Sequence, residues 1–359
     1  MDRHHRDPAD RSRVGSVDSP TEASEDLVAR SLDIDRIRAA RARIDPVFLD
    51  TPLVSHARLD RLLGCSLIAK VEILNPIRSF KGRGAELFAS TVLLPGEPVV
   101  CASAGNFGQG LAYATVKRGH ACIVYAAKTA NTIKVAAMRN LGAEVRLHGA
   151  DFDVAKHSAR LYAQQTGQRF VEDGAEPAIA EGAGTIGLEL AAAASRLDVV
   201  IVPLGNGALL AGAGAALRFA APATNIVAVV AEAAPAMMLS LNAGCVIETE
   251  TADTIADGVA VRVPIPSILA VLPGFFDDVV AVSESNILRA MRAIAEHFSL
   301  FVEPAGALGI AAVLEYPHRF AGARVATILC GGNLSAALRQ QMTAPDGPAR
   351  LIEEQGGCL

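Results

Sequence analysis

Short runs of β-branched and other apolar residues alternate along this chain with alanine-rich stretches that end in glycine. The apolar runs are LIAKVEIL (67–74), PVVCAS (98–103), ACIVYAA (121–127), EVRLHG (144–149), DVVIVPL (198–204), NIVAVVAE (225–232) and RVATILC (324–330). Among the stretches between them are GQGLAYATVKRG (108–119) and TIKVAAMRNLGA (132–143). Near-continuous apolar strands joined by helices are typical of parallel sheets that are covered on both faces. The sequence therefore predicts an α/β protein with parallel or mostly parallel sheets covered by helices.

Size and composition narrow the class of protein. The 359 residues are enough for two lobes, and 51% apolar with 20% charged residues is a globular composition. The formal net charge is −5 with acidic and basic residues interspersed, so we expect no nucleic-acid partner. Six cysteines occur at wide spacings without a C-x-x-C pair, which excludes the common zinc signatures and fits the reduced thiols of a cytoplasmic protein.

Neither the ends of the chain nor its apolar region at 199–238 predicts membrane targeting. The N-terminal segment has mixed charge and no apolar run, so it is not a secretory signal, and we expect residues 1–27 to be a disordered tail. Residues 346–359 are expected to form a second tail. Region 199–238 is interrupted by Pro203, Asn206, Arg218 and Pro222, so no membrane-spanning helix is expected there.

Three glycine-rich turns each follow a predicted strand and precede a predicted helix. They are S-A-G-N-F-G-Q-G (103–110), G-N-G-A-L-L-A-G (205–212) and G-G-N-L-S (331–335). In parallel sheets, ligands bind at the carboxyl ends of the strands, where such turns lie. The three turns are therefore the places where a binding site is expected.

The turn at Gly205 has several interpretations. Free N–H groups at a helix N-terminus can hold a phosphate, but tight packing of a strand against a helix also requires glycine. A dinucleotide site is a third reading, with Gly205 and Gly207 after a strand and Glu232 at the end of the next strand as the ribose-binding acid. Leu210 replaces the third glycine of that fingerprint.

Two further features have both a chemical and a structural reading. The turn from Ser103 to Asn106 supplies a hydroxyl, backbone donors and an amide that could hold a carboxylate, or it is a structural turn. Lys81 in N-P-I-R-S-F-K-G-R-G-A is expected near the start of a helix. A desolvated amine there suits covalent catalysis, whereas an ordinary helix-start lysine keeps its amine in water.

Taken together and in this order, S-F-K-G-R-G-A, S-A-G-N-F-G-Q-G, G-N-G-A-L and C-G-G-N resemble the fold-type II pyridoxal-phosphate enzymes. The resemblance is strongest to the serine/threonine ammonia-lyases (threonine dehydratases) and serine racemases. A-E-G-A-G-T-I-G-L-E (180–189), T-I-A-D-G-V-A-V (254–261) and E-P-A-G-A (303–307) extend it, so that it covers residues 30–340. The family has a tryptophan synthase beta-like fold.

The resemblance implies a set of cofactor-binding and substrate-binding residues. Lys81 matches the lysine that binds pyridoxal 5′-phosphate covalently and acts as the base. The other cofactor contacts implied are Phe80 beside the pyridine ring, Asn106 at the 3′-oxygen, Cys330 at the pyridine nitrogen, and Gly205, Asn206, Gly207, Ala208 and Leu209 around the phosphate. The loop for the substrate carboxylate is matched by Ser103, Ala104, Gly105, Asn106 and Phe107.

The resemblance also implies the reaction, which is elimination of water from a β-hydroxy amino acid to give a 2-oxo acid and ammonia. L-Threonine, L-serine or a related larger amino acid is the expected substrate, with the cofactor phosphate supplying a proton to the leaving hydroxyl. Ala104 stands where racemases of the family have serine, which favours the lyase. Phe107 replaces a usual histidine, and V-E-D-G-A (171–175) replaces H-P-F-D-D, so the side-chain preference is expected to differ.

Other expectations complete the interpretation. We expect a large cofactor-binding domain from residues 28–97 plus 174–345, a small substrate-binding domain from 98–173, a cytoplasmic homodimer, and no appended regulatory domain. Glu232 resembles one ligand of the family's cation site, but the downstream aspartate is missing, so no metal is expected. The alternatives are a threonine synthase-like or racemase activity, a nicotinamide-dependent oxidoreductase, or a binding protein on the same scaffold.

Overall fold

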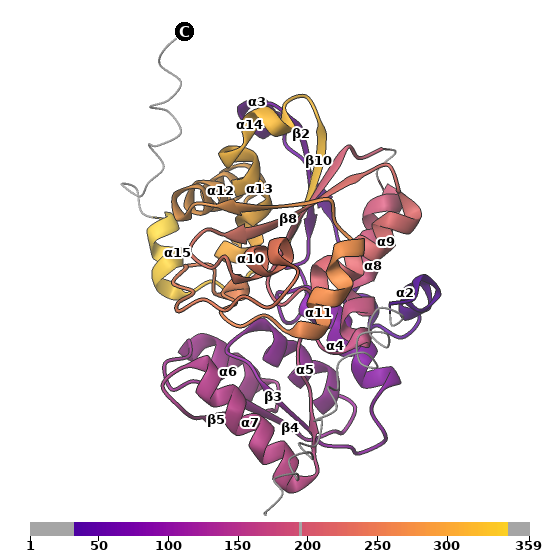
Figure 1. The fold of residues 1–359 in the computed structure, drawn as a ribbon, viewed down its shortest axis with the longest axis vertical. Helices are drawn as coiled ribbons and strands as arrows, with labels where there is room; N and C mark the ends of the chain where they lie inside the picture. The colour runs from indigo at the N-terminus through magenta and orange to yellow at the C-terminus, as the bar shows by residue number, and fades with distance from the viewer. Residues whose placement is uncertain (1–31, 194–195, 344–359) are drawn as a thin grey trace, which may run out of the picture.

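The computed structural model describes residues 32–193 and 196–343, which form two sheets joined through an extensive interface (Figure 1). The expected tails at 1–27 and 346–359 lie outside the described residues. The six-stranded sheet has the order β1 (Leu53–Val54), β2 (Ser66–Val71), β10 (Arg324–Leu329), β7 (Val199–Pro203), β8 (Asn225–Ala231) and β9 (Asp278–Val282). The four-stranded sheet has the order β5 (Glu144–Leu147), β4 (Cys122–Ala126), β3 (Val99–Ala102) and β6 (Arg169–Phe170).

Both sheets are parallel except for β1, which pairs antiparallel with β2. The mostly parallel α/β fold predicted from the alternating pattern is confirmed. All seven apolar runs contain a strand. Three strands were not predicted, namely β1, β6 and β9.

Helices cover the two sheets separately. Those of the four-stranded sheet are α5 (Asn106–Val116), α6 (Thr132–Asn140) and α7 (Phe152–Thr166). The larger lobe carries α2 (Ile34–Ala40), η1 (Pro46–Phe48), α3 (Ala57–Leu63), α4 (Lys81–Thr91), α8 (Pro177–Ala193), α9 (Ala208–Ala220), α10 (Ala236–Ala243), η2 (Asp257–Val259), α11 (Pro266–Val271), η3 (Leu272–Gly274), α12 (Glu284–Phe298), α13 (Pro304–Glu315), α14 (Pro317–Phe320) and α15 (Ala336–Thr343). Figure 1 shows α8 and α9 on one side of the larger sheet, and α12 and α13 on the other.

Local sequence explains where these helices begin and end. The Asp151 carboxylate accepts a hydrogen bond from the Val154 N–H and caps α7, and Gly167 ends that helix with φ +67°. The A-E-G-A-G-T-I-G-L-E segment lies in α8 and packs against α9. At Gly212 of α9, a Cβ atom would lie 1.8 Å from the Ala180 carbonyl oxygen, so only glycine permits this close approach of the two helices.

A buried ion cluster fixes α4, the helix that begins at Lys81. The fully buried Arg83 guanidinium contacts Glu72 on one side at 2.8 Å and Glu189 on the other at 2.6 Å. Lys70 pairs with the same Glu189 carboxylate at 2.6 Å. Because buried charges are tolerated only when they are paired, this cluster sets the position of α4 against β2 and α8.

Candidate active site

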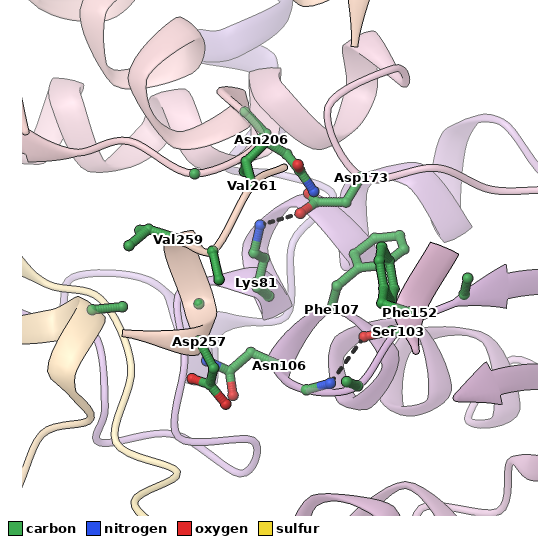
Figure 2. Close-up of a pocket in the computed structure, with 18 of the residues that line it drawn as sticks. Lys81, Ser103, Asn106, Phe107, Phe152, Asp173, Asn206, Asp257, Val259 and Val261 are labelled. Atoms are coloured by element: carbon green, nitrogen blue, oxygen red, sulfur yellow. Dashed lines mark hydrogen bonds and ion pairs between the residues drawn. The ribbon is translucent and has the colours of Figure 1, made fainter. Parts of the chain in front are cut away.

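A cavity of about 420 Å³ lies between the two sheets, at the carboxyl ends of β3, β7 and β10. Figure 2 shows side chains from both lobes pointing into it. Every residue that the sequence singled out for the cofactor or the substrate lines this cavity: Phe80, Lys81, Ser103, Ala104, Gly105, Asn106, Phe107, Gly205, Asn206, Gly207, Ala208, Leu209 and Cys330. Segments that are far apart in sequence thus meet in one place. Their roles toward a cofactor and a substrate stay proposals.

Lys81 is held at the cavity by the turn that precedes it. The Asn75 side-chain oxygen accepts hydrogen bonds from the N–H groups of Ile77 and Ser79, both at 3.2 Å. The Phe80 N–H then donates to the Cys330 carbonyl at 3.1 Å, which ties the start of α4 to the end of β10. The Lys81 amine lies 4.6 Å from the centre of the Phe80 ring, and its side chain is 15% exposed. The expectation of a lysine at a helix start is confirmed, and its amine points into the cavity (Figure 2).

The Ser103 turn is folded around its own hydroxyl group. Ser103 Oγ accepts hydrogen bonds from the N–H groups of Gly105 at 3.2 Å and Gly108 at 2.9 Å. Helix α5 begins at Asn106, and the first N–H groups of a helix have no acceptor within it. Such a helix N-terminus attracts an anion. The turn can therefore hold a carboxylate, and the serine hydroxyl shapes the turn while it does so.

The geometry of the Gly205 turn fits both explanations of its glycines, which are close packing and phosphate binding. A Cβ at Gly205 would lie 2.8 Å from the Gly258 carbonyl oxygen, so close packing requires this glycine. Gly207 has φ +92°, a conformation that favours glycine, and α9 begins at Ala208. The residues at the N-terminus of α9 line the cavity, so their backbone N–H groups could bind a phosphate there.

A polar network fixes the Asn106 side chain. Its Nδ2 donates to Glu303 Oε1 at 2.6 Å, and its Oδ1 accepts from Asn333 at 2.8 Å. Glu303 is only 2% exposed, and burial raises its pKa to about 7 although the Lys134 cation, 3.8 Å away, opposes the rise. The second Asn106 amide hydrogen remains available to an oxygen in the cavity.

Cys330 is the last residue before the Gly331 turn and is 5% exposed. Its thiol donates to the Ala305 carbonyl at 3.5 Å, and burial raises the pKa of the thiol. The group is therefore a neutral, weak donor at the wall of the cavity. Cys330 also belongs to the apolar core. It is therefore both a small buried core residue and a residue of the cavity wall, as the two interpretations from sequence allowed.

Several charged residues of the cavity were not identified from sequence, and four of them contact Lys81 or one another. Asp173 contacts the Lys81 amine at 2.5 Å, and Lys134 pairs with Asp257 at 2.6 Å and approaches Glu303. Asp173, Asp257 and Glu303 lie in segments that the sequence had flagged, V-E-D-G-A, T-I-A-D-G-V-A-V and E-P-A-G-A. Their roles could not be predicted, because each carboxylate contacts a residue that is distant in the sequence. No motif in the sequence distinguishes Lys134, which is simply an early residue of a predicted helix.

The dinucleotide reading requires Glu232 at the same site. Glu232 is exposed, and it is absent from the residues that line the cavity. Within residues 32–193 and 196–343, no cluster of three or more histidine, cysteine, aspartate or glutamate side chains has the arrangement of a metal site. Across the same residues, no helix is both long and apolar enough to cross a bilayer.

The residues present fit a pyridoxal-phosphate group. Lys81 offers an amine for the aldehyde, and the N-terminus of α9 offers backbone donors for the phosphate. Asn106 offers an amide for the ring oxygen and Cys330 a thiol for the ring nitrogen. The Asp173 Oδ1 atom is buried without a hydrogen-bond partner among the described residues, so it can accept a hydrogen bond from water or from a bound molecule.

Comparisons with known proteins agree with this site. A family model described as pyridoxal-phosphate dependent enzyme matches residues 44–331. The biosynthetic L-threonine dehydratase of Salmonella typhimurium is 35% identical over 79% of this chain and 56% of its own length. The L-threonine ammonia-lyase of Thermotoga maritima is 34% identical over 84% of this chain and 76% of its own. A crystal structure of T.th. threonine deaminase has a TM-score of 0.78 at 35% identity and covers 84% of this chain and 98% of that one.

The biosynthetic dehydratases are longer proteins, and this chain spans about half the length of those it matches. The match nevertheless includes Lys81, the Ser103 turn, the Gly205 turn and Cys330, because all of them fall between residues 44 and 331. The chain belongs to the fold-type II family of pyridoxal-phosphate-dependent enzymes.

Proposed function

We propose that the protein eliminates water from a small β-hydroxy amino acid, L-threonine, L-serine or a related larger one, and releases a 2-oxo acid and ammonia. The observation that carries the proposal is the convergence of the Lys81 amine and two helix N-termini on one cavity. One helix N-terminus suits the cofactor phosphate and the other suits the substrate carboxylate. The similarity to an L-threonine ammonia-lyase that the chain matches over 76% of its length supports the choice of reaction.

When held by Lys81 and the N-terminus of α9, pyridoxal phosphate would supply an acceptor for electron density from the substrate's α-carbon. Lys81 removes the α-proton as general base, because its amine lies at the cavity wall within reach of a bound substrate. The turn from Ser103 to Phe107 binds the substrate carboxylate through its backbone N–H groups. Glu303 accepts a hydrogen bond from the Asn106 amide at 2.6 Å, and the amide held in this way would orient the cofactor ring.

Ala104 and Phe107 limit what else the site can do. Racemisation requires a second acid/base on the opposite face of the substrate, and the Ala104 methyl group cannot carry a proton. Phe107 is 6% exposed and gives the substrate pocket an apolar wall. These residues favour elimination from a substrate with an uncharged side chain. A homodimer and a cytoplasmic location remain predictions, and sedimentation equilibrium checks the first.

The proposal is tested by measuring 2-oxo acid and ammonia production by the cofactor-loaded protein. L-Serine, L-threonine and larger β-hydroxy amino acids serve as substrates, and Lys81→Ala is the control. Oxo acid formation that is lost in the variant is the expected result. Formation of the D-amino acid without oxo acid, followed by chiral chromatography, would establish a racemase instead.

A further inference from the structure

Asp173 is an acidic side chain at the centre of the reaction cavity. Its Oδ2 atom lies 2.5 Å from the Lys81 amine, although the two residues are 92 positions apart in the sequence. Its Oδ1 atom is buried and has no hydrogen-bond partner among the described residues. The residue as a whole is only 9% exposed. A buried carboxylate oxygen without a protein donor can accept a hydrogen bond from water or from a bound molecule.

Asp173 also lies in the V-E-D-G-A segment, where the chain departs from the H-P-F-D-D of many relatives. In Figure 2 its side chain points toward Lys81. The pair is therefore a feature of this chain's own residues.

The other charged groups that line the cavity contact groups other than Lys81, although the buried Oε2 atom of Glu303, like Asp173 Oδ1, has no hydrogen-bond partner among the described residues. Three ion pairs join Lys134 to Asp257, Lys156 to Glu172, and Arg262 to Asp153. Asp151 accepts from the Val154 N–H at the start of α7, and Glu303 accepts from Asn106. No histidine or tyrosine is found among the described residues that line the cavity. Asp173 is thus the carboxylate placed to exchange a proton with Lys81.

We propose that Asp173 is the catalytic acid that protonates the leaving hydroxyl group, in place of the cofactor phosphate expected from sequence. This assignment rests on the proposed function. Lys81 takes the α-proton, and the electron pair of the broken C–H bond becomes the new Cα–Cβ double bond. Lys81 passes the proton to Asp173 Oδ2. The Cβ–O bond breaks, its electron pair stays on oxygen, and the Asp173 proton completes a water molecule. Lys81 and Asp173 then regain their starting protonation states.

The experiment compares two leaving groups in the cofactor-loaded enzyme. Hydroxide needs a proton to leave, whereas chloride does not, so L-serine and β-chloro-L-alanine separate the acid step from all others. Asp173→Asn keeps the size of the side chain but cannot supply the proton. Since general acid catalysis contributes at least about 100-fold, kcat for L-serine should fall about 100-fold in this variant. The kcat for β-chloro-L-alanine should change by less than about 3-fold on the same reasoning.

Two controls separate this role from a structural one. Glu172→Gln removes a neighbouring carboxylate that pairs with Lys156, and it should leave the ratio of the two kcat values at the wild-type level. Absorbance titration of the apo-protein with pyridoxal phosphate should give the same affinity for wild type and Asp173→Asn. That readout does not depend on turnover, and it shows that the site still forms.

The outcomes are distinct. Selective loss of elimination from L-serine supports the assignment. An equal loss with both substrates, or a cofactor affinity that falls in parallel, overturns it and makes Asp173 a structural partner of Lys81. Wild-type protein that eliminates from none of L-serine, L-threonine, the larger β-hydroxy amino acids and β-chloro-L-alanine overturns the proposed function, and the assignment with it.

Discussion

At the scale of single residues, Glu303 is a carboxyl group whose environment predicts a pH effect. Burial raises its pKa from the ordinary 4.5 to about 7, so the folded protein holds this proton more tightly than the unfolded chain. The stabilisation is therefore fully present below the unfolded pKa of 4.5 and is lost as the pH rises through about 7. Each pH unit in that window costs up to about 1.4 kcal/mol of the free energy of unfolding.

Glu303→Gln removes this titration while a side-chain oxygen stays available to Asn106. We expect the free energy of unfolding of the variant, relative to wild type, to rise between about pH 5 and about pH 7, following the titration of the buried group. Urea denaturation of the cofactor-loaded proteins at several pH values measures it. A difference that is flat across this range would mean that Glu303 stays ionised in the folded protein.

Site residues differed in how far sequence could reveal them. Lys81, Asn106 and the Gly205 turn could be found because each lies in a recognisable local pattern after a strand. Asp173 could not, because its role depends on contact with Lys81 across the cavity, and spacing along the chain carries no information about such a contact. The same reason hid the Lys134–Asp257 pair, which joins segments 123 positions apart.

At the scale of helices and strands, the α8–α9 contact should be sensitive to a single methyl group. In Gly212→Ala the new Cβ would meet the Ala180 carbonyl oxygen at 1.8 Å, and neither backbone can move without shifting its helix. We expect the free energy of unfolding to fall by about 3 kcal/mol or more, at the upper end for overpacked cores. Urea denaturation gives the value.

Gly274→Ala is the matched control, since no atom lies within 4 Å of a Cβ at that exposed position. It should change the free energy of unfolding by less than about 0.5 kcal/mol, as surface substitutions usually do. Equal effects of the two substitutions would show that the close approach of α8 and α9 does not limit stability.

Most elements were predictable because their apolar runs are long and uninterrupted. Two of the three missed strands, β1 and β6, have two residues each, which is too short for any periodic pattern. The third, β9, has the sequence D-V-V-A-V, which is a short apolar run of the same kind as those that predicted the other strands. β1 pairs antiparallel with β2, and no local sequence pattern predicts this pairing.

At the scale of the whole molecule, ion pairs connect the two lobes across the cavity. Lys134 on α6 is 4% exposed and pairs with Asp257 on η2 at 2.6 Å. The same lysine lies beneath Gly105, where an added Cβ would be 3.5 Å from its amine. Lys134 therefore couples the expected substrate-carboxylate turn to the larger lobe. The proposed division at residues 98–173 stays a prediction, although the four-stranded sheet comes from residues 99–170.

We expect Lys134→Met to raise KM for the amino acid about 10-fold, because the ion pair that ties Lys134, beside the substrate turn, to Asp257 of the larger lobe is lost, and one such contact is worth about 1.4 kcal/mol. The kcat value should fall less, since Lys81 and Asp173 are untouched. Steady-state kinetics over a range of substrate concentrations separates the two constants. An unchanged KM would show that the substrate turn is held without this lysine.

The central claim is that Lys81 carries the cofactor. The direct measurement is peptide mass spectrometry of protein loaded with pyridoxal phosphate and treated with borohydride, which makes the lysine–cofactor linkage permanent. We predict that the pyridoxyl group is found on the peptide that contains Lys81, and that Lys81→Ala protein carries none. Modification of Lys134, a buried lysine of the same cavity, or of no lysine at all, would contradict the account.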